Sequence, residues 1–192
     1  MRKLVYFVAS TLDGFIAGPD GSYGFFPFSA DSELARYLRS EYPETLPTQL
    51  RKALGFDDAP NRVFDTVVMG RGTYEPALKE GITSPYRHLR QVVFSRSLRS
   101  RDPEVEVVAG EPGAFVRALK REDGKHLWLC GGAELAGVLW PEIDEWVVKL
   151  NPVAAGDGLP LARRPFAPAP LTLSDCKPLA EGVVVLRYTR AR

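Results

Sequence analysis

The sequence contains little cysteine and histidine. Its 192 residues include only Cys130, Cys176, His88 and His126 of these two types. The cysteines have no CxxC spacing, and the histidines stand apart from acidic and cysteine residues. We therefore expect no disulfide framework, no bound metal and no catalytic triad. An apolar strand position should raise the pKa of the Cys130 thiol and make it inert. This cysteine content predicts a reducing, cytoplasmic location.

Long hydrophobic runs and an excess of one charge are also missing. Lys and Arg number 25 and Asp and Glu number 24, which leaves a net charge of +1. This balance gives no basic surface for nucleic acid or an anionic membrane. The apolar stretch LVYFVAS near the N-terminus is too short to span a bilayer and lacks a small-residue cleavage site. We expect no membrane segment and no targeting peptide.

What is present is typical of one globular domain covering residues 1–192. Short apolar runs without polar alternation predict strands that are covered on both faces, as in a parallel sheet. These runs lie at 3–9, 64–69, 90–95, 104–109, 125–130 and 145–151. Amphipathic stretches between them predict helices. The helical stretches lie at 31–41, 112–123 and 133–140.

The chain ends with two strand-like runs around Ala180, Glu181 and Gly182, which predict an antiparallel pair. Together these patterns predict an α/β fold, a three-layer sandwich with a mixed, mostly parallel central sheet and a C-terminal antiparallel hairpin. Two stretches interrupt the order. Residues 42–62 hold a probable short helix among prolines, and residues 152–170 read as a long loop with extended segments.

Two predicted strands end in glycine where a helix begins, in VVMGRGTYE (67–75) and LWLCGGAELAGVLW (127–140). Ligands of open α/β sheets bind at the carboxyl ends of strands, where helix N-termini carry unpaired N–H groups and positive partial charge. Glycine lets a phosphate approach such a backbone closely. Each junction taken alone is explained equally well as a tight turn.

Arginine and hydroxyl side chains add positive charge and donors at these strand ends. Arg71 stands between two glycines, and a guanidinium binds phosphate through paired charge-assisted bonds. Thr73 is expected to cap the following helix. Ser95 and Arg96 follow another apolar run, a pattern that suits a phosphate monoester or, equally, a solvated loop.

Five motifs in order, VASTLDGFIAGPDG, VVMGRGTYE, VVFSRS, LCGGAELAGVLW and LNPVAAGDGLPL, resemble the dihydrofolate-reductase-like family. They most resemble the branch of the C-terminal reductase domain of bacterial riboflavin biosynthesis. The resemblance covers nearly the whole chain, with 42–62 as an insertion. It implies the dihydrofolate-reductase-like sandwich, NADPH as the cofactor and a homodimer.

The resemblance also assigns roles to residues. Ala9 at a strand end and the stretch Ile16–Ala17 would line the nicotinamide. The two glycine junctions would bind the dinucleotide phosphates, and Ser95 and Arg96 would flank the 2′-phosphate. Family members often have a cis peptide bond at the glycine pair. The implied cofactor-binding residues are Ala9, Ile16, Ala17, Gly70, Arg71, Gly72, Thr73, Ser95, Arg96, Gly131, Gly132, Ala133, Glu134 and Leu135.

The substrate side of the site is less well defined. Asp31 is the nearest equivalent of the carboxylate that holds the pterin ring in dihydrofolate reductases, and it is the catalytic candidate. Asp31 and Glu33 are explained better as first-turn residues that only favour the helix dipole. Phe25, Phe26 and Phe28 replace an expected tryptophan. Asp13 reads as a turn residue.

We therefore expect an NADPH-dependent reductase that transfers hydride to a small heterocycle of the ribosylated pyrimidine or pterin type. The family branch makes 5-amino-6-(5-phosphoribosylamino)uracil the first candidate substrate, although the chain lacks the HxE and PCxxC pattern of a zinc deaminase. Three alternatives stay open: a nucleotide-binding module without turnover, a dihydrofolate reductase proper, and an oligomeric scaffold protein whose glycines are only turns.

Overall fold

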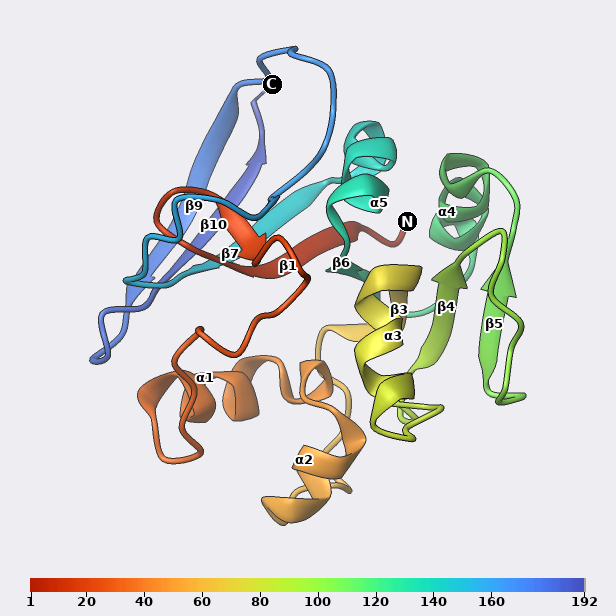
Figure 1. Cartoon of the computed structure of the whole chain (residues 1–192), viewed down its shortest axis with the longest axis horizontal. Coiled ribbons are helices and arrows are strands. Elements are labelled where there is room, and N and C mark those ends of the chain that lie inside the picture. The colour runs from red at the N-terminus through yellow and green to blue at the C-terminus, as the bar shows by residue number, and fades with distance from the viewer. Residues whose placement is uncertain (192) are drawn as a thin grey trace.

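The computed structural model describes residues 1–191 and is built on an eight-stranded sheet (Figure 1). The strand order is β5-β4-β3-β6-β1-β7-β10-β9. Neighbours from β5 through β7 run parallel, whereas β10 joins β7 and β9 joins β10 in antiparallel pairs. The predicted mixed sheet with a C-terminal hairpin is confirmed. The strands are β1 Leu4–Ser10, β3 Phe64–Gly70, β4 Arg90–Phe94, β5 Val105–Val108, β6 His126–Gly131, β7 Glu145–Leu150, β9 Leu171–Pro178 and β10 Val184–Arg190.

The central strands are apolar because helices cover both faces of the sheet. One face carries α1, α2 and α3, and the other carries α4 and α5. In Figure 1, α1 and α2 lie below the sheet and α5 above it. Each face has its own hydrophobic cluster, so the molecule has the expected three layers. The helices are α1 Glu33–Glu41, α2 Thr48–Ala53, α3 Arg71–Lys79, α4 Pro112–Arg121 and α5 Ala133–Val138, with 3-10 turns η1 Pro43–Thr45 and η2 Trp140–Glu142.

Helix α1 begins later than the sequence pattern indicated. Ser32 is its N-cap, and the Ser32 hydroxyl accepts a hydrogen bond from Ala35 N at 3.0 Å. A serine in extended conformation before Glu33 is a strong start signal. The prediction that the helix includes Asp31 is therefore wrong by two residues.

The 42–62 insertion is anchored by one buried carboxylate. Glu44 has no solvent exposure, and its two oxygens accept hydrogen bonds from the backbone N–H groups of Arg62, Val63 and Phe64 at 3.1, 2.7 and 2.7 Å. These bonds fix the amino end of β3. Arg51, which is 1% exposed, donates to backbone carbonyls of the same segment, including that of Asp57 at 3.1 Å. The predicted short helix is present as α2.

The predicted loop 152–170 contains a two-residue strand, β8 (Leu159–Pro160), which pairs with β2 (Phe15–Ala17). Asp13 joins this loop to the turn after β1. Its carboxylate accepts from Ala155 N at 3.1 Å and Gly156 N at 2.7 Å, and these bonds together with the Thr11 hydroxyl lower its pKa to about 2. Asp13 therefore acts as a turn residue, as expected.

Candidate active site

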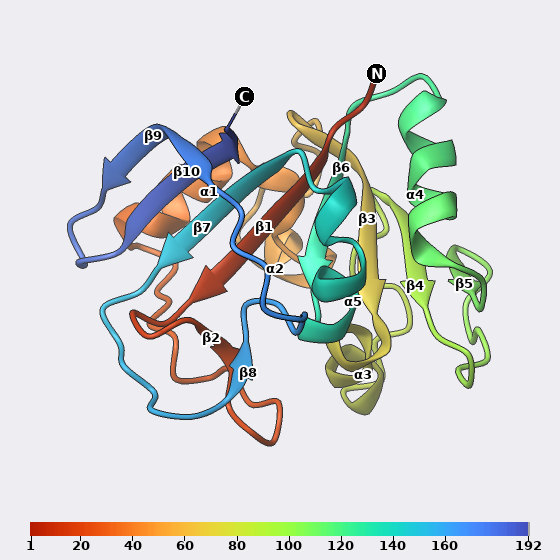
Figure 2. The same cartoon turned by 90° about the horizontal axis from the view of Figure 1, so that it is seen from above.

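The carboxyl ends of the parallel strands meet at one edge of the sheet. Figure 2 shows the arrowheads of β1, β3, β4 and β7 pointing toward the edge where α3, β2 and β8 lie. The register places Gly70 at the end of β3 beside Phe94 at the end of β4. On the other side of β3, Met69 pairs with Gly131 at the end of β6. Three of the strand ends chosen from sequence are therefore neighbours.

The two glycine junctions are in direct contact. A β-carbon on Gly132 would lie 3.4 Å from Thr73 Oγ1 and 3.8 Å from Gly70 Cα. Gly131 and Gly132 have φ of 145° and 101°, a conformation that side chains other than glycine rarely adopt. All peptide bonds within residues 1–191 are trans. The glycines thus allow two strand-to-helix turns to approach each other backbone against backbone.

Thr73 does not cap α3, and that prediction is wrong. Gly70 occupies the N-cap position in extended conformation, and α3 starts immediately at Arg71. Thr73 therefore lies in the first turn of the helix. Its hydroxyl faces the Gly131–Gly132 junction, where it lines the space between the two turns.

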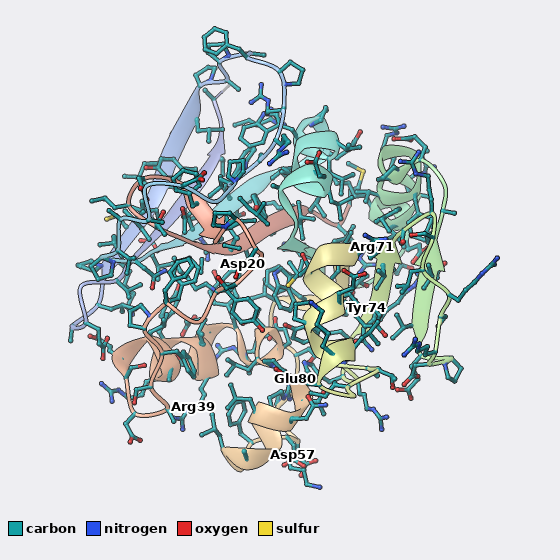
Figure 3. All side chains as sticks on the ribbon, in the orientation of Figure 1. Asp20, Arg39, Asp57, Arg71, Tyr74 and Glu80 are labelled. Atoms are coloured by element: carbon teal, nitrogen blue, oxygen red, sulfur yellow. The ribbon has the colours of Figure 1, made fainter. Side chains whose placement is uncertain are left out.

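Arg71 reaches toward the loop after β4. Its Nη1 donates to Ser97 Oγ at 3.0 Å, and its Nε pairs with Glu75 at 3.2 Å. Its side chain is 53% exposed. Figure 3 shows Arg71 at the opposite end of α3 from Glu80. The arginine of the first junction is therefore held beside the third strand end.

The loop after β4 is shaped by a serine turn. Ser95 Oγ accepts from Ser97 N at 3.3 Å and from Leu98 N at 3.0 Å. Arg96 is exposed between them, and none of the ion pairs within residues 1–191 includes it. Arg96 and Arg71 consequently bring two guanidinium groups to one loop. Ser97 is the positioning partner that the predicted set omitted.

Helix α5 begins directly after the second junction. The first backbone hydrogen bond of the helix is donated by Ala136 N to Gly132 O at 2.8 Å. The backbone N–H groups of Ala133, Glu134 and Leu135 therefore have no acceptor within the helix. The Glu134 carboxylate is highly exposed and pairs with Arg163 at 3.2 Å. This pair offsets the negative charge that Glu134 brings to the start of α5.

The residues predicted around the nicotinamide lie at the opposite side of the same edge. Ala9 is partly exposed near the end of β1, where it pairs with Lys149 of β7. Ile16 and Ala17 belong to β2, and Ala17 is buried. A β-carbon on Gly158 would lie only 2.2 Å from Ala17 O, so the 152–158 loop packs tightly against β2.

Asp31 lies outside this group. It is exposed and precedes the N-cap of α1, and its backbone carbonyl accepts from Arg36 at 2.6 Å. Glu33 has a structural partner, because its carboxylate accepts from Ala180 N at 2.7 Å in the hairpin turn. The catalytic role of Asp31 stays a prediction.

A half-buried lysine was missed. Lys149 Nζ lies 4.2 Å from the centre of the Phe7 ring, and burial lowers the pKa of this lysine to about 8. Nearby, burial raises the pKa of the Cys130 thiol to about 12, the direction expected for an apolar strand position. The available signal was the one basic residue within the apolar run EWVVKLN.

The structure also shows the surroundings of His88 and the state of the cysteines. His88 contacts Glu44 O through Nε2 at 2.8 Å and Thr48 Oγ1 through Nδ1 at 3.2 Å. Both cysteines are free. Residues 1–191 contain no group of three or more His, Cys, Asp or Glu side chains placed to hold a metal ion. Among the same residues, every helix is too short or too polar to cross a bilayer.

The sheet order, the two helical layers and the glycine edge define a dihydrofolate-reductase-like α/β protein. The model of one family, the RibD C-terminal domain, matches residues 2–185. The chain belongs to this family, which is related to the reductase of riboflavin biosynthesis.

Two curated proteins of Bacillus subtilis (strain 168) are similar along nearly their whole length. The uncharacterized protein YwjB is 32% identical over 194 residues, which cover 99% of each chain. The uncharacterized protein YyaP is 24% identical over 200 residues, covering 97% of this chain and 94% of YyaP.

Two solved structures share the fold. One is a Shewanella sp. PV-4 protein named for riboflavin biosynthesis, with a TM-score of 0.70, 21% identity and full coverage of both chains. The other is a Thermotoga maritima diaminohydroxyphosphoribosylaminopyrimidine deaminase/5-amino-6-(5-phosphoribosylamino)uracil reductase, with a TM-score of 0.65 and 15% identity. The match covers 99% of this chain and 57% of that bifunctional protein.

Proposed function

We propose that this protein is an NADPH-dependent reductase of small heterocyclic compounds. The observation that carries the proposal is the contact of the Gly70–Thr73 turn with Gly131–Gly132, beside the arginine-bearing loop after β4. Such a junction offers backbone N–H groups without side chains in the way, which is what a pyrophosphate requires.

The residues fit each part of the cofactor. A β-carbon on Gly72 would meet no atom within 4 Å, so the backbone there is open to a ligand. Arg71 and Arg96 provide guanidinium groups for the 2′-phosphate that distinguishes NADPH from NADH. Ala9, Ile16 and Ala17 would border the nicotinamide. When bound, the nicotinamide supplies the hydride, and the protein contributes orientation and exclusion of water.

The substrate is proposed from family membership. A relative in fold is named as a 5-amino-6-(5-phosphoribosylamino)uracil reductase, so a ribosylated aminopyrimidine is the first candidate and a pterin the second. Phe25 and Phe28 are 37% and 47% exposed on the loop before α1, where they could stack on a flat ring. We further propose a homodimer in the cytoplasm.

A second candidate function is nucleotide binding without turnover. The exposed position of Asp31 favours it, because the substrate ring then lacks the buried carboxylate of dihydrofolate reductases. Steady oxidation of NADPH in the presence of a pyrimidine or pterin distinguishes the two candidates.

Thermal melting with NADPH, with NADH and without nucleotide tests the cofactor assignment. NADPH at 100 times its Kd should stabilise the fold by about 2.7 kcal/mol. We expect NADPH to protect better than NADH, and Arg96→Ala to reduce this preference by about 1.5–3 kcal/mol. Arg99→Ala, an exposed arginine of the same loop, is the matched control. Equal protection of the parent protein by both nucleotides would refute the 2′-phosphate site.

A further inference from the structure

Lys149 brings an ammonium group to the sheet face on which α1 and α3 pack. It stands next to last in β7, directly beside Ala9 of β1 and Val185 of β10. Its Nζ lies over the Phe7 ring at 4.2 Å. Val185 and Phe7 belong to the hydrophobic cluster of this face, so the lysine extends from a core strand rather than from the rim.

The Lys149 ammonium has no carboxylate partner. None of the ion pairs and side-chain hydrogen bonds formed within residues 1–191 includes it, whereas Lys3 and Lys120 each pair with an acid. The Phe7 ring below Nζ stabilises the charge in part. An ammonium in apolar surroundings without a counter-ion is costly, and this cost lowers the pKa of Lys149 to about 8.

The titratable groups near Lys149 on other strands and loops include three weak acids. Cys130 of β6 and Tyr86 of the loop before β4 lie close to each other, and both have raised pKa values because they are buried. Burial also raises the pKa of Tyr42, which packs on Phe7 at 4.7 Å between ring centres. Arg187 of β10 is paired with Glu145 of β7, and Tyr23 of the loop before α1 raises the pKa of Tyr86.

This position keeps access to solvent. Ala9, Tyr86, Cys130 and Lys149 are each partly exposed. The residues two positions before Ala9, Cys130 and Lys149 on the same sheet face are buried, and these are Phe7, Trp128 and Val147. The sheet face is therefore open at its carboxyl edge, beside the strand end proposed to border the nicotinamide.

We propose that Lys149 Nζ is the proton donor to the substrate. The inference rests on the proposed reductase function and deepens it. Hydride adds to the carbon of a C=N or C=O group, and the heteroatom takes a proton from Nζ. The electrons of the broken N–H bond remain on Nζ as the lone pair of a neutral amine, which water then protonates. The substrate is reduced and the nicotinamide is oxidised.

Two substitutions separate proton donation from charge. Lys149→Met removes the proton, and Lys149→Arg keeps a positive charge that does not dissociate at these pH values. With 5-amino-6-(5-phosphoribosylamino)uracil or dihydrofolate as the probe, both should lower kcat/KM about 10²–10⁴-fold. Lys177→Met is the matched control, because the Lys177 ammonium also lies over an aromatic ring, that of Tyr37 at 5.0 Å, but on the exposed strand β9.

Two further readouts test proton donation: a titration of the ligand-free protein and the pH profile of kcat/KM. NMR titration of the Lys149 ammonium in the ligand-free protein should give a pKa near 8. The kcat/KM of the parent protein should fall above that pH. In Lys149→Arg this fall should be absent. A titration at the ordinary value of lysine would overturn the inference, and so would parent-like activity of Lys149→Arg.

The outcomes distinguish this inference from the proposed function. NADPH should protect Lys149→Met as well as the parent protein, because the phosphate-binding residues are unchanged. If Lys149→Met loses turnover but NADPH still protects it from thermal unfolding, the result supports both the reductase function and the proton donor. Full turnover in Lys149→Met overturns only the proton donor. Absence of NADPH protection, or of NADPH oxidation by the parent protein with either probe, overturns the reductase and the proton donor with it.

Discussion

Arg71 Nη1 donates a hydrogen bond to Ser97 Oγ across 3.0 Å, which ties the first turn of α3 to the loop after β4. The bond connects residues 26 positions apart in sequence. This bond places one guanidinium of the proposed phosphate site beside that loop. Its second partner, Glu75 at 3.2 Å, competes with an incoming phosphate.

Removing the two partners of Arg71 should have opposite effects. Ser97→Ala frees the guanidinium and should weaken NADPH binding by about 0.5–1.5 kcal/mol, the usual contribution of one hydrogen bond. Glu75→Gln removes the competing charge and should tighten binding. Fluorescence titration measures both. A change of the same sign in both variants would contradict this arrangement.

Gly72→Ala tests whether the glycine at the first junction leaves space for a ligand or is needed only for folding. A methyl group there would meet no atom within 4 Å, and alanine favours a helix more than glycine does, so the ligand-free melting temperature should stay equal or rise. NADPH binding should weaken by about 1–3 kcal/mol if the methyl group fills ligand space. Gly110→Ala, in an exposed loop, is the control. Unchanged NADPH affinity would exclude close contact with Gly72.

Lys149→Met should make the protein more stable at neutral pH. The unfolded chain has the ordinary lysine pKa of 10.5, and the folded value is about 8. Between these values the unfolded state binds more protons, so parent stability rises with pH across the window. Below pH 8 the variant should gain about 1–3 kcal/mol, and the gain should shrink toward pH 10.5. Urea unfolding at several pH values measures this, and a variant less stable than the parent at pH 7 would contradict it.

Glu44→Gln should destabilise the fold without touching the nucleotide site. The amide keeps one oxygen for Val63 and Phe64 but turns an NH₂ group toward the N–H of Arg62, which leaves two donors facing each other. The loss should be about 1–3 kcal/mol for a buried polar mismatch. Chemical denaturation measures it, with the exposed Glu41→Gln as control. Equal stability of both variants would mean that the carboxylate does not anchor the insertion.

Most of the fold follows from local sequence patterns. Strands such as β1 and β6 lie between two layers of helices, so their apolar runs lack alternation and are easily recognised. The start of α1 was misplaced because two acidic residues next to Ser32 also look like a first turn. The strand β8 has only two residues and pairs with β2 across the chain, which no local pattern signals.

The candidate site was predictable where backbone conformation decides it. Gly131 and Gly132 adopt positive φ, and two consecutive glycines in the sequence already indicate such a backbone conformation. The direction of the Arg71 side chain depends on Ser97, which only the parallel pairing of β3 and β4 brings near. Lys149 was overlooked because a lysine in a strand usually points to solvent. Its burial depends on α1 and the neighbouring strands covering that face of the sheet.

The position of β1 in the sheet has a consequence for biosynthesis. This strand is translated before the other strands of the sheet, yet both of its neighbours, β6 at His126–Gly131 and β7 at Glu145–Leu150, come after β3, β4 and β5. Until then the nascent segment LVYFVAS has no edge to join, while β3 and β4 are already available to each other. Pairing of β1 must therefore wait until β6 and β7 have been made, and until then its unpaired apolar segment is prone to aggregation.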